Sequence, residues 1–498
     1  MNRPRSSNGD EADRPNLNNL NANSIKDEKT PPSTTTTTTN NNTKANNTSA
    51  VITSKNKIAY GQYQIDLYFQ ALTAGKKPIT TTDPNKLEQQ AREAMSPQGF
   101  NYVFGGAGEQ ATMHANRLAF RQWKVIPRML RDTLPRNLSV KLFGKTYDSP
   151  VLMAPIGVQS AYHPDAETGV AKACAALNVP FIYSTASSTP LEEIVAALEE
   201  TDHPSPSPET EEPAPTANPT ATAPAEGKET EEPKPSRWFQ LYWPVDDDIT
   251  ASLLSRARVA GCEVLVVTLD TFTMAWRPLD LDTGFLPFAV GEGNALGFSD
   301  SVFRQKFSDK FSTGENEVQV EDNVIAASRY WAGEVFSGHA HKWEDLATLR
   351  KLWGDRPIVL KGVLSVEDAV LAARSGVDGI IVSNHGGRQL DGAVPSLEML
   401  PEIVDAVGDR LTVLFDSGIR TGVDVLKALA LGAKAVLVGR PVIYGLGIAG
   451  TEGAKHVLAS LLADVDQSMG LLGVQTVGEL NRSMLRKLSY GGDVKTSL

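Results

Sequence analysis

The segment TVLFDSGIRTGVDVLKALALGAKAVLVGR, residues 412–440, contains one complete strand–helix–strand repeat. Its apolar runs TVLFDSG (412–418) and AVLVGR (435–440) flank TGVDVLKALALG, whose apolar residues recur with the period of a helix. Within each run the apolar residues are consecutive, which indicates a strand that is buried on both faces of a sheet. Strands separated by one helix pair in parallel, so the segment predicts an α/β fold with a parallel sheet.

The same alternation repeats along most of the chain. Helical patterns separate the successive apolar runs, and TEGAKHVLASLLADVDQSM follows the last of them as the expected eighth helix. Eight such units predict a closed (β/α)8 TIM barrel rather than an open doubly wound sheet. The other six apolar runs are VLMAP (151–155), PFIYST (180–185), WFQLYW (238–243), EVLVVTLD (263–270), PIVLKG (357–362) and GIIVSN (379–384).

Two segments outside this pattern are too polar to form a core. Residues 1 to about 50 are mainly Asn, Thr and Ser, and residues 201–235 contain nine prolines among Glu, Thr and Ala. Such compositions favour disorder, because little apolar surface is available to offset the entropy of ordering. We therefore predict a disordered tail (1–56), an N-terminal helical lead-in (57–150) and a barrel (151–485) that is interrupted by a disordered acidic insertion (201–235).

The two long connections differ in their place relative to the strands. The insertion 201–235 precedes a strand and therefore belongs to the N-terminal face of the barrel, away from the chemistry. Residues 271–342 follow the strand 263–270 and belong to the opposite face, where a long loop often serves as a lid.

Composition and charge exclude several classes of function. No run of 18 apolar residues is present, so no membrane span is expected, and the polar N-terminus predicts a cytoplasmic location. Eight of the eleven net negative charges fall in 199–235, and no clustered Lys and Arg footprint suggests a nucleic-acid partner. Cys174 and Cys262 lie in apolar stretches and are predicted to be buried core residues, so no metal site is expected from them.

Polar and ionisable residues gather where the predicted strands end. Active sites of such barrels are built at the C-terminal ends of the strands. A barrel that is closed only for stability does not need many charges on one rim, because each buried charge is costly unless it is paired. The strand ends carry Gln240, Tyr242, Thr268, Asp270, Lys361, Ser383, His385, Arg388, Asp416, Gly418, Arg420, Gly439 and Arg440.

The last two strand ends predict a phosphate site. FDSGIRTG and VGRP place glycines, which allow close approach of the backbone, next to Arg420 and Arg440, and a following helix N-terminus offers free N–H groups. The alternative is that the glycines serve only tight turns. Lys361 would then lie on the cofactor ring, where a fixed positive charge stabilises an anionic reduced flavin. No GxGxxG follows a strand, which disfavours a dinucleotide bound as in a Rossmann fold.

Six segments together carry a family resemblance. SNHGGRQLDG, LVVTLDT, WFQLYW, VLKGV, FDSGIR and VGRP resemble the FMN-dependent 2-hydroxy acid oxidases and dehydrogenases, and the resemblance covers roughly residues 58–485. Within that family, GQYQIDLYFQ, FNYVFGGAGEQAT and WRPLDLDTGFLPF are most similar to the lactate 2-monooxygenases. The resemblance implies FMN as the cofactor and a small 2-hydroxy acid and oxygen as reactants.

The resemblance also implies a role for individual residues. His385 corresponds to the catalytic base, and Asp270 to the acid that hydrogen-bonds this base and stabilises its charge. The substrate carboxylate and hydroxyl would be bound by Arg277, Arg388, Tyr102 and Tyr242. FMN would be contacted by Pro155, Ile156, Gly157, Ser184, Gln240, Thr268, Lys361, Ser383, Asp416, Gly418, Arg420, Gly439 and Arg440.

These residues predict the oxidation of an L-2-hydroxy acid, with lactate as the expected substrate, oxygen as the acceptor and oxidative decarboxylation of the retained product. The alternatives are an oxidase that releases the 2-oxo acid and hydrogen peroxide, a dehydrogenase with another acceptor, and a non-catalytic flavin- or phosphate-binding scaffold. Ala186 stands where plant glycolate oxidases have tryptophan, which leaves the substrate side chain open. Whether His385 takes the Cα proton or the hydroxyl proton is also open. A homo-oligomer, either a tetramer or an octamer, is expected from the resemblance.

Overall fold

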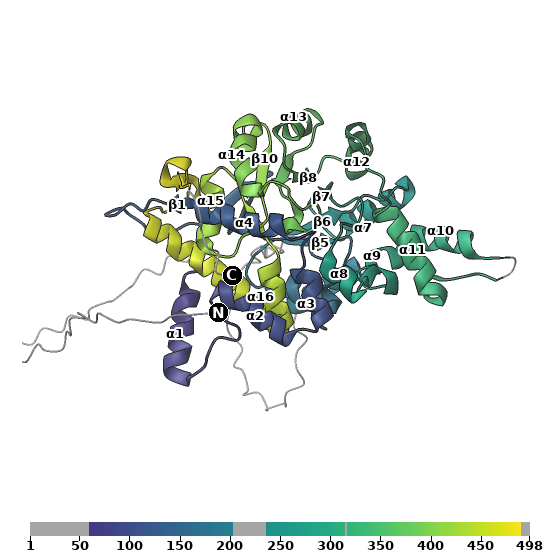
Figure 1. Cartoon of the computed structure of the whole chain (residues 1–498), viewed down its shortest axis with the longest axis horizontal. Coiled ribbons are helices and arrows are strands. Elements are labelled where there is room, and N and C mark those ends of the chain that lie inside the picture. Colours follow the sequence, from purple (N-terminus) through teal and green to yellow (C-terminus); the bar gives the residue numbers. More distant parts are fainter. Residues whose placement is uncertain (1–58, 203–235, 314–315, 490–498) are drawn as a thin grey trace, which may run out of the picture. The chain divides into compact units, whose positions relative to one another are not determined.

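The computed structural model describes residues 59–202, 236–313 and 316–489, and Figure 1 shows their arrangement. Eight parallel strands close into a barrel, in which each strand from β4 to β11 pairs with the next and β11 pairs with β4. The predicted (β/α)8 barrel is therefore confirmed. The predicted tail 1–56 and residues 203–235 of the predicted insertion lie outside the described residues.

Each barrel strand overlaps one of the eight predicted runs, and nearly all strand residues are buried, as expected for strands covered on both faces. The strands are β4 (Val151–Met153), β5 (Phe181–Ser184), β6 (Arg237–Leu241), β7 (Val264–Thr268), β8 (Ile358–Val363), β9 (Gly379–Val382), β10 (Thr412–Phe415) and β11 (Val436–Val438).

The outer helices also follow the predicted pattern, with two differences in their bounds. Helix α16 begins at Arg440 rather than after residue 450, and its axis breaks at Ala449 and Gly450. Helix α6 extends to Asp202, which lies within the predicted insertion. The helices are α5 (Ala166–Ala175), α6 (Leu191–Asp202), α7 (Asp247–Val259), α12 (Leu346–Trp353), α13 (Val366–Arg374), α14 (Ser396–Val407), α15 (Gly422–Ala430) and α16 (Arg440–Leu472).

The lead-in is helical only as far as Gln122. It comprises α1 (Gln62–Ala74), α2 (Pro84–Ala94), α3 (Pro97–Phe104) and α4 (Ala111–Gln122), followed by β1 (Trp123–Val125), β2 (Val140–Leu142) and β3 (Lys145–Tyr147). Strand β1 pairs with β12 (Leu485–Lys487). The β2–β3 hairpin covers the N-terminal end of the barrel, where the rings of Phe143 and Tyr147 lie 5.8 and 6.2 Å from that of Trp238.

The long connection after β7 is a helical excursion rather than an extended loop. It carries α8 (Pro278–Thr283), α9 (Ala295–Phe298), α10 (Ser301–Phe311) and α11 (Val324–Val335). Phe303, Phe307 and Trp331 are fully buried within it and belong to the same hydrophobic core as the barrel. That this excursion acts as a lid stays a prediction.

Cys174 and Cys262 are buried, as predicted. Among the described residues, no helix is long and apolar enough to cross a bilayer.

Candidate active site

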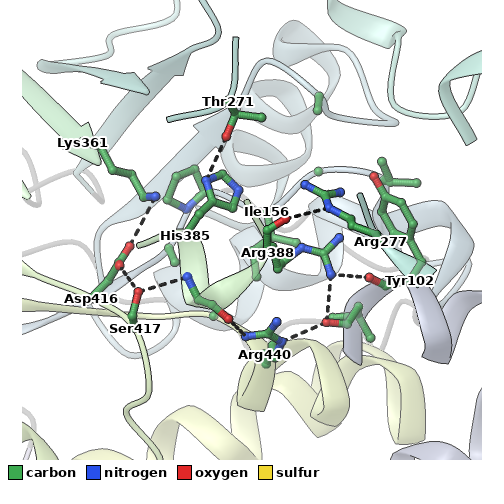
Figure 2. Close-up of a pocket in the computed structure, with 18 of the residues that line it drawn as sticks. Tyr102, Ile156, Thr271, Arg277, Lys361, His385, Arg388, Asp416, Ser417 and Arg440 are labelled. Carbon is green, nitrogen blue, oxygen red and sulfur yellow. Dashed lines mark hydrogen bonds and ion pairs between the residues drawn. The ribbon is translucent and has the colours of Figure 1, made fainter. Parts of the chain in front are cut away.

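A cavity with an empty volume of about 980 Å³ opens at the C-terminal ends of the barrel strands (Figure 2). Most of the site residues predicted from sequence line it: Tyr102, Pro155, Ile156, Gly157, Tyr242, Arg277, Lys361, His385, Arg388, Asp416, Gly418, Arg420, Gly439 and Arg440.

The remaining predicted residues lie behind the wall of the cavity. Ser184, Gln240, Thr268 and Ser383 are buried, and the first three are hydrogen-bonded to one another across the ends of neighbouring strands. Ser184 Oγ donates to Gln240 Oε1 at 3.1 Å, and Gln240 Nε2 donates to Thr268 Oγ1 at 3.0 Å. Lys361 Nζ, itself buried, donates to Ser383 Oγ at 3.1 Å. We infer that these hydrogen bonds fix the positions of Gln240 and Lys361.

Asp270 is the last of the five predicted site residues that do not line the cavity. It lies directly behind His385. His385 Nδ1 is 2.8 Å from Asp270 Oδ1. The Thr271 hydroxyl donates to the same carboxylate oxygen at 2.8 Å and lies 3.1 Å from His385 Nδ1, the contact drawn in Figure 2. Because Nδ1 is engaged by the carboxylate, Nε2 is the imidazole atom that is left to exchange a proton with a bound ligand.

The surroundings keep this pair as a neutral imidazole beside an ionised carboxylate. Burial lowers the pKa of His385, and the nearby Lys361 adds to this, although Asp270 opposes it. Burial alone would raise the pKa of Asp270, but His385, Lys361 and the hydrogen bonds it accepts bring that pKa well below its ordinary value. A neutral imidazole that is oriented by a carboxylate is suited to act as a general base.

The turn that presents His385 depends on its two glycines. His385 has a φ of +57°, and Gly386 and Gly387 follow with φ values of +65° and +75°. A Cβ at Gly386 would come within 2.7 Å of Arg440 Nη1, and one at Gly387 within 2.7 Å of the Met113 backbone nitrogen. The turn therefore needs glycine for both its conformation and its close packing.

Ser417, just after the neighbouring strand β10, also holds this turn in place. Ser417 Oγ accepts hydrogen bonds from the backbone N–H groups of Gly386 at 3.0 Å and Asn384 at 3.4 Å. It donates to Asp416 Oδ1 at 2.8 Å, and the Asp416 carboxylate lies 3.5 Å from Lys361 Nζ. Ser417 has a φ of +84°, a strained conformation for a residue with a side chain, and such strain is concentrated at functional sites.

Two guanidinium groups meet on the side of the cavity that is formed by Tyr102 (Figure 2). Arg277 Nε donates to the Arg388 carbonyl at 2.9 Å, and Arg388 Nη1 donates to the Tyr102 carbonyl at 2.6 Å. Burial, reinforced by the charge of Arg388, lowers the pKa of Arg277. The nearest carboxylate oxygen to Arg277, on Asp280, is 4.0 Å away. Arg277 is buried and Arg388 is half-buried. Two such cations with so little negative charge nearby favour an anionic ligand.

A second pair of arginines lies at the ends of the last two strands. Arg440 is the first residue of α16, and Arg420 follows Gly418, whose φ is +95°. Burial lowers the pKa of Arg440 to about 9 and also lowers that of Arg420. Cationic side chains beside a glycine turn and a helix N-terminus form a set of donors that suits a phosphate group.

Further residues, most of them apolar, complete the lining of the cavity. Phe288 and Phe336 come from the excursion after β7, and their rings lie 5.1 Å apart. The Phe336 ring is also 5.2 Å from that of Tyr242. The lining residues outside the predicted set are Val103, Ala154, Val158, Tyr162, Ala186, Thr271, Met274, Phe288, Phe336, Gly386, Ser417 and Ile419.

Comparison with known proteins identifies the family. The FMN-dependent dehydrogenase family matches residues 91–206 and 216–487. The chain belongs to this family.

Similar proteins cover most of the chain. An FMN-dependent alpha-hydroxy acid dehydrogenase of Penicillium citrinum is 49% identical over 441 residues, which are 89% of this chain and 99% of the relative. An L-lactate oxidase of Lysinibacillus sphaericus is 37% identical over 433 residues, 86% of this chain and 98% of the relative. A crystal structure of mandelate oxidase with (S)-4-hydroxymandelic acid is similar with a TM-score of 0.64 and 37% identity, and covers 82% of this chain and 98% of that one.

This member of the FMN-dependent dehydrogenase family is an FMN-dependent 2-hydroxy acid oxidoreductase. The donors around the cavity fit the cofactor: Arg420 and Arg440 suit its phosphate, and Lys361 offers the positive charge that favours an anionic reduced ring. We expect the backbone at 155–157 and the glycines 418 and 439 to let the cofactor approach closely. Among the described residues, no group of His, Cys, Asp and Glu side chains is arranged to hold a metal ion.

The phosphate assignment predicts the behaviour of Arg420→Ala. Loss of a charge-assisted hydrogen bond of about 1.5–3 kcal/mol is expected to weaken FMN binding by roughly tenfold to a hundredfold. The dissociation constant can be measured by titrating the apoprotein with FMN and following flavin fluorescence. Arg410→Ala is the matched control, because Arg410 is exposed and lies outside the cavity. Equal FMN affinity for the two variants would contradict the assignment.

Proposed function

We propose that the protein oxidises an L-2-hydroxy acid to the 2-oxo acid in this cavity, with oxygen as the final electron acceptor. The observation that carries the proposal is that the His385 imidazole, backed by Asp270, lines the same cavity as Arg277 and Arg388. FMN supplies an acceptor for two electrons when it is bound.

The arginines would bind and orient the substrate. A planar carboxylate matches the parallel N–H donors of a guanidinium group, and two such groups fix its direction. With the carboxylate held on the side of Tyr102, the α-carbon and its hydroxyl would be directed toward His385. Tyr242, which lines the same cavity, would contact the hydroxyl group.

His385 would accept the proton that the substrate loses. Its Nδ1 is engaged by Asp270, so the proton would go to Nε2. The resulting imidazolium is stabilised by the adjacent carboxylate, much as in a serine-protease triad. Residues at the rim would exclude water, because Phe288, Phe336 and Met274 line the cavity beside the polar groups.

The pKa directions predict the pH dependence of substrate oxidation. His385 acts as a base only in its neutral form, and burial places its pKa below the ordinary histidine value of about 6.5. The rate of anaerobic FMN reduction is therefore expected to fall as the pH drops through that lowered pKa, and to be level from about pH 7 to about pH 9. Stopped-flow absorbance across this range tests the prediction. A rate that keeps rising tenfold per pH unit above about pH 7 would contradict it.

The apolar part of the lining concerns the side chain of the substrate. Ala186, Val158 and Met274 lie with Phe288 and Phe336 around the same cavity. This compartment accommodates apolar α-substituents, of which the methyl group of lactate is the smallest. We propose lactate as a substrate and expect larger apolar 2-hydroxy acids, including aryl ones, to be accepted as well.

The excursion after β7 supports oxidative decarboxylation. It contributes Met274, Arg277, Phe288 and Phe336 to the cavity, so its closure would retain the 2-oxo acid together with peroxide. Lactate and oxygen would then give acetate, carbon dioxide and water. If the 2-oxo acid leaves first, the products are pyruvate and hydrogen peroxide, and the protein is an oxidase.

One experiment tests this function in two stages. The visible spectrum of the FMN-bound protein is recorded under nitrogen with L-lactate, 2-hydroxyisocaproate and mandelate, and the products formed in air are then identified. Bleaching by these acids is expected, with acetate formed from lactate. Stoichiometric pyruvate and peroxide would reject the decarboxylation. A yellow protein that no 2-hydroxy acid bleaches would reject the catalytic proposal and favour a binding scaffold.

Two further expectations also remain proposals. A cytoplasmic location and assembly into a tetramer or an octamer are inferred from the sequence and from the resemblance to the family.

A further inference from the structure

Helix α1 (Gln62–Ala74) has no buried residue, and one of its faces is an exposed apolar stripe. Ile65, Tyr68, Phe69 and Leu72 are 50, 63, 64 and 84% exposed. Their spacing of three, four and seven residues places them on one face of the helix, which we call the α1 stripe. The face toward the barrel is narrow: Tyr63 and Leu67 are half-buried, and the Tyr63 hydroxyl lies 2.6 Å from His456 Nδ1 of α16. Figure 1 shows α1 beside the yellow α16.

Within the described residues, no side chain of this helix is buried, so packing there contributes little to its stability. Isolated helices shorter than about 12–15 residues are marginal in water, and helices in proteins owe most of their stability to a buried apolar face. Single exposed apolar residues are ordinary, whereas a contiguous apolar stripe marks a surface that another molecule covers.

The apolar surface continues beyond the helix. Ile65 lines a hollow together with Leu134 and Pro135, and Leu134 is 69% exposed. Met129 and Leu130, earlier in the same loop, are also exposed. This continuity matters because a stable interface buries on the order of 1,000 Å² or more, which is larger than one helical stripe provides.

The chain outside the described residues offers little to cover this surface. Residues 203–235 contain no Val, Ile, Leu, Met, Phe, Tyr or Trp, and residues 490–498 contain three of them. Residues 1–58 contain seven, spread among Asn, Thr, Ser and charged residues. A membrane surface is also a poor match. Helices that lie on membranes carry Lys and Arg on their polar face, whereas the only charged residue of α1 is Asp66.

The stripe is complementary to itself. Its four members are symmetric about the midpoint between Tyr68 and Phe69. In an antiparallel pair of α1 helices, Ile65 would face Leu72 of the second copy, and Tyr68 would face Phe69 of the second copy. Every apolar residue thus meets another apolar residue, which is the condition for a two-fold interface in which both copies use the same patch.

We propose that the α1 stripe is a self-association surface, against which α1 of a second copy of this chain packs in the antiparallel direction. This inference does not depend on the proposed reaction. It assigns a two-fold contact of the assembly to Ile65, Tyr68, Phe69 and Leu72.

The test measures the mass of the full-length, FMN-bound protein by light scattering after size-exclusion chromatography. The wild-type chain of 53.6 kDa is expected to elute at an even multiple of that mass, and Phe69→Asp/Leu72→Asp at half the wild-type value. The absorbance of bound FMN, recorded on the same fractions, shows that the variant is folded. Val259→Asp is the control, because Val259 is 88% exposed at the end of α7, and its mass should equal that of the wild type.

A second pair of variants tests the antiparallel pairing. In Ile65→Lys/Leu72→Asp, each Lys would face an Asp of the second copy, so the wild-type mass is expected. In Ile65→Asp/Leu72→Asp, like charges would meet, and the mass is expected to fall twofold. Equal masses for these two variants would overturn the antiparallel arrangement. A wild-type monomer would overturn the proposal, as would binding of the wild type to phosphatidylserine-containing vesicles that Leu72→Asp abolishes.

Discussion

His385→Gln is expected to keep FMN bound and to slow FMN reduction by a 2-hydroxy acid by about 10³- to 10⁴-fold. The reason is that glutamine fills a similar volume but cannot accept a proton, and general-base catalysis contributes up to about 10⁴-fold. Asp270 would also lose the cation that it is placed to stabilise. The rate is measured by stopped-flow absorbance under nitrogen with saturating L-lactate.

The control for this variant is His339→Gln, which changes an exposed histidine outside the cavity. It should reduce FMN at the wild-type rate. The flavin content of the two variants should also be equal, because the FMN contacts are assigned to other residues. If His385→Gln is reduced within tenfold of the wild-type rate, His385 is not the base.

The barrel could be predicted from sequence because its signal is local. Each of its strands is buried on both faces, so the apolar residues are consecutive, as in EVLVVTLD and TVLFDSG. The hairpin formed by β2 and β3 was not predicted. Its strands are three residues each, and the segment VKLFGKTY mixes lysines with apolar residues because only one side covers the barrel end.

The polar site residues could be predicted because strand ends meet on one rim whatever the loops do. His385 and Arg440 follow strands, Lys361 lies near the end of one, and the closed barrel brings all three around one cavity. Gln240 and Thr268 form a buried hydrogen bond at the strand ends, and their predicted contact with FMN stays a prediction.

Phe288 and Phe336 could not be predicted as lining residues. They lie within or next to helical turns of the excursion after β7, about fifty residues apart in sequence, and meet only after that excursion packs onto the barrel. An aromatic residue there reads equally well as part of a hydrophobic core. Ser417 offered a weak signal, because its place inside FDSGIR pointed to the site but not to the turn that it holds.

Arg277→Met should lower kcat/KM for a 2-hydroxy carboxylate by about 10³-fold. Arg277 is 5% exposed, and its charge is poorly balanced by protein carboxylates, since the Asp280 oxygen is 4.0 Å away. A substrate carboxylate would supply that balance, and truncating one partner of a buried charge pair costs about 2–5 kcal/mol. Methionine keeps an unbranched apolar stem of similar length, so packing in the cavity changes little.

A neutral substrate separates this charge effect from a general disturbance of the site. The amide of the same 2-hydroxy acid lacks the negative charge, so the wild-type protein should use it poorly, and Arg277→Met should change its kcat/KM by less than about tenfold. The variant would then have lost most of the wild-type preference for the acid over the amide. Losses of equal size for both substrates would show that Arg277 supports the cavity, through its bonds to Arg388 and Gln389, without binding the carboxylate.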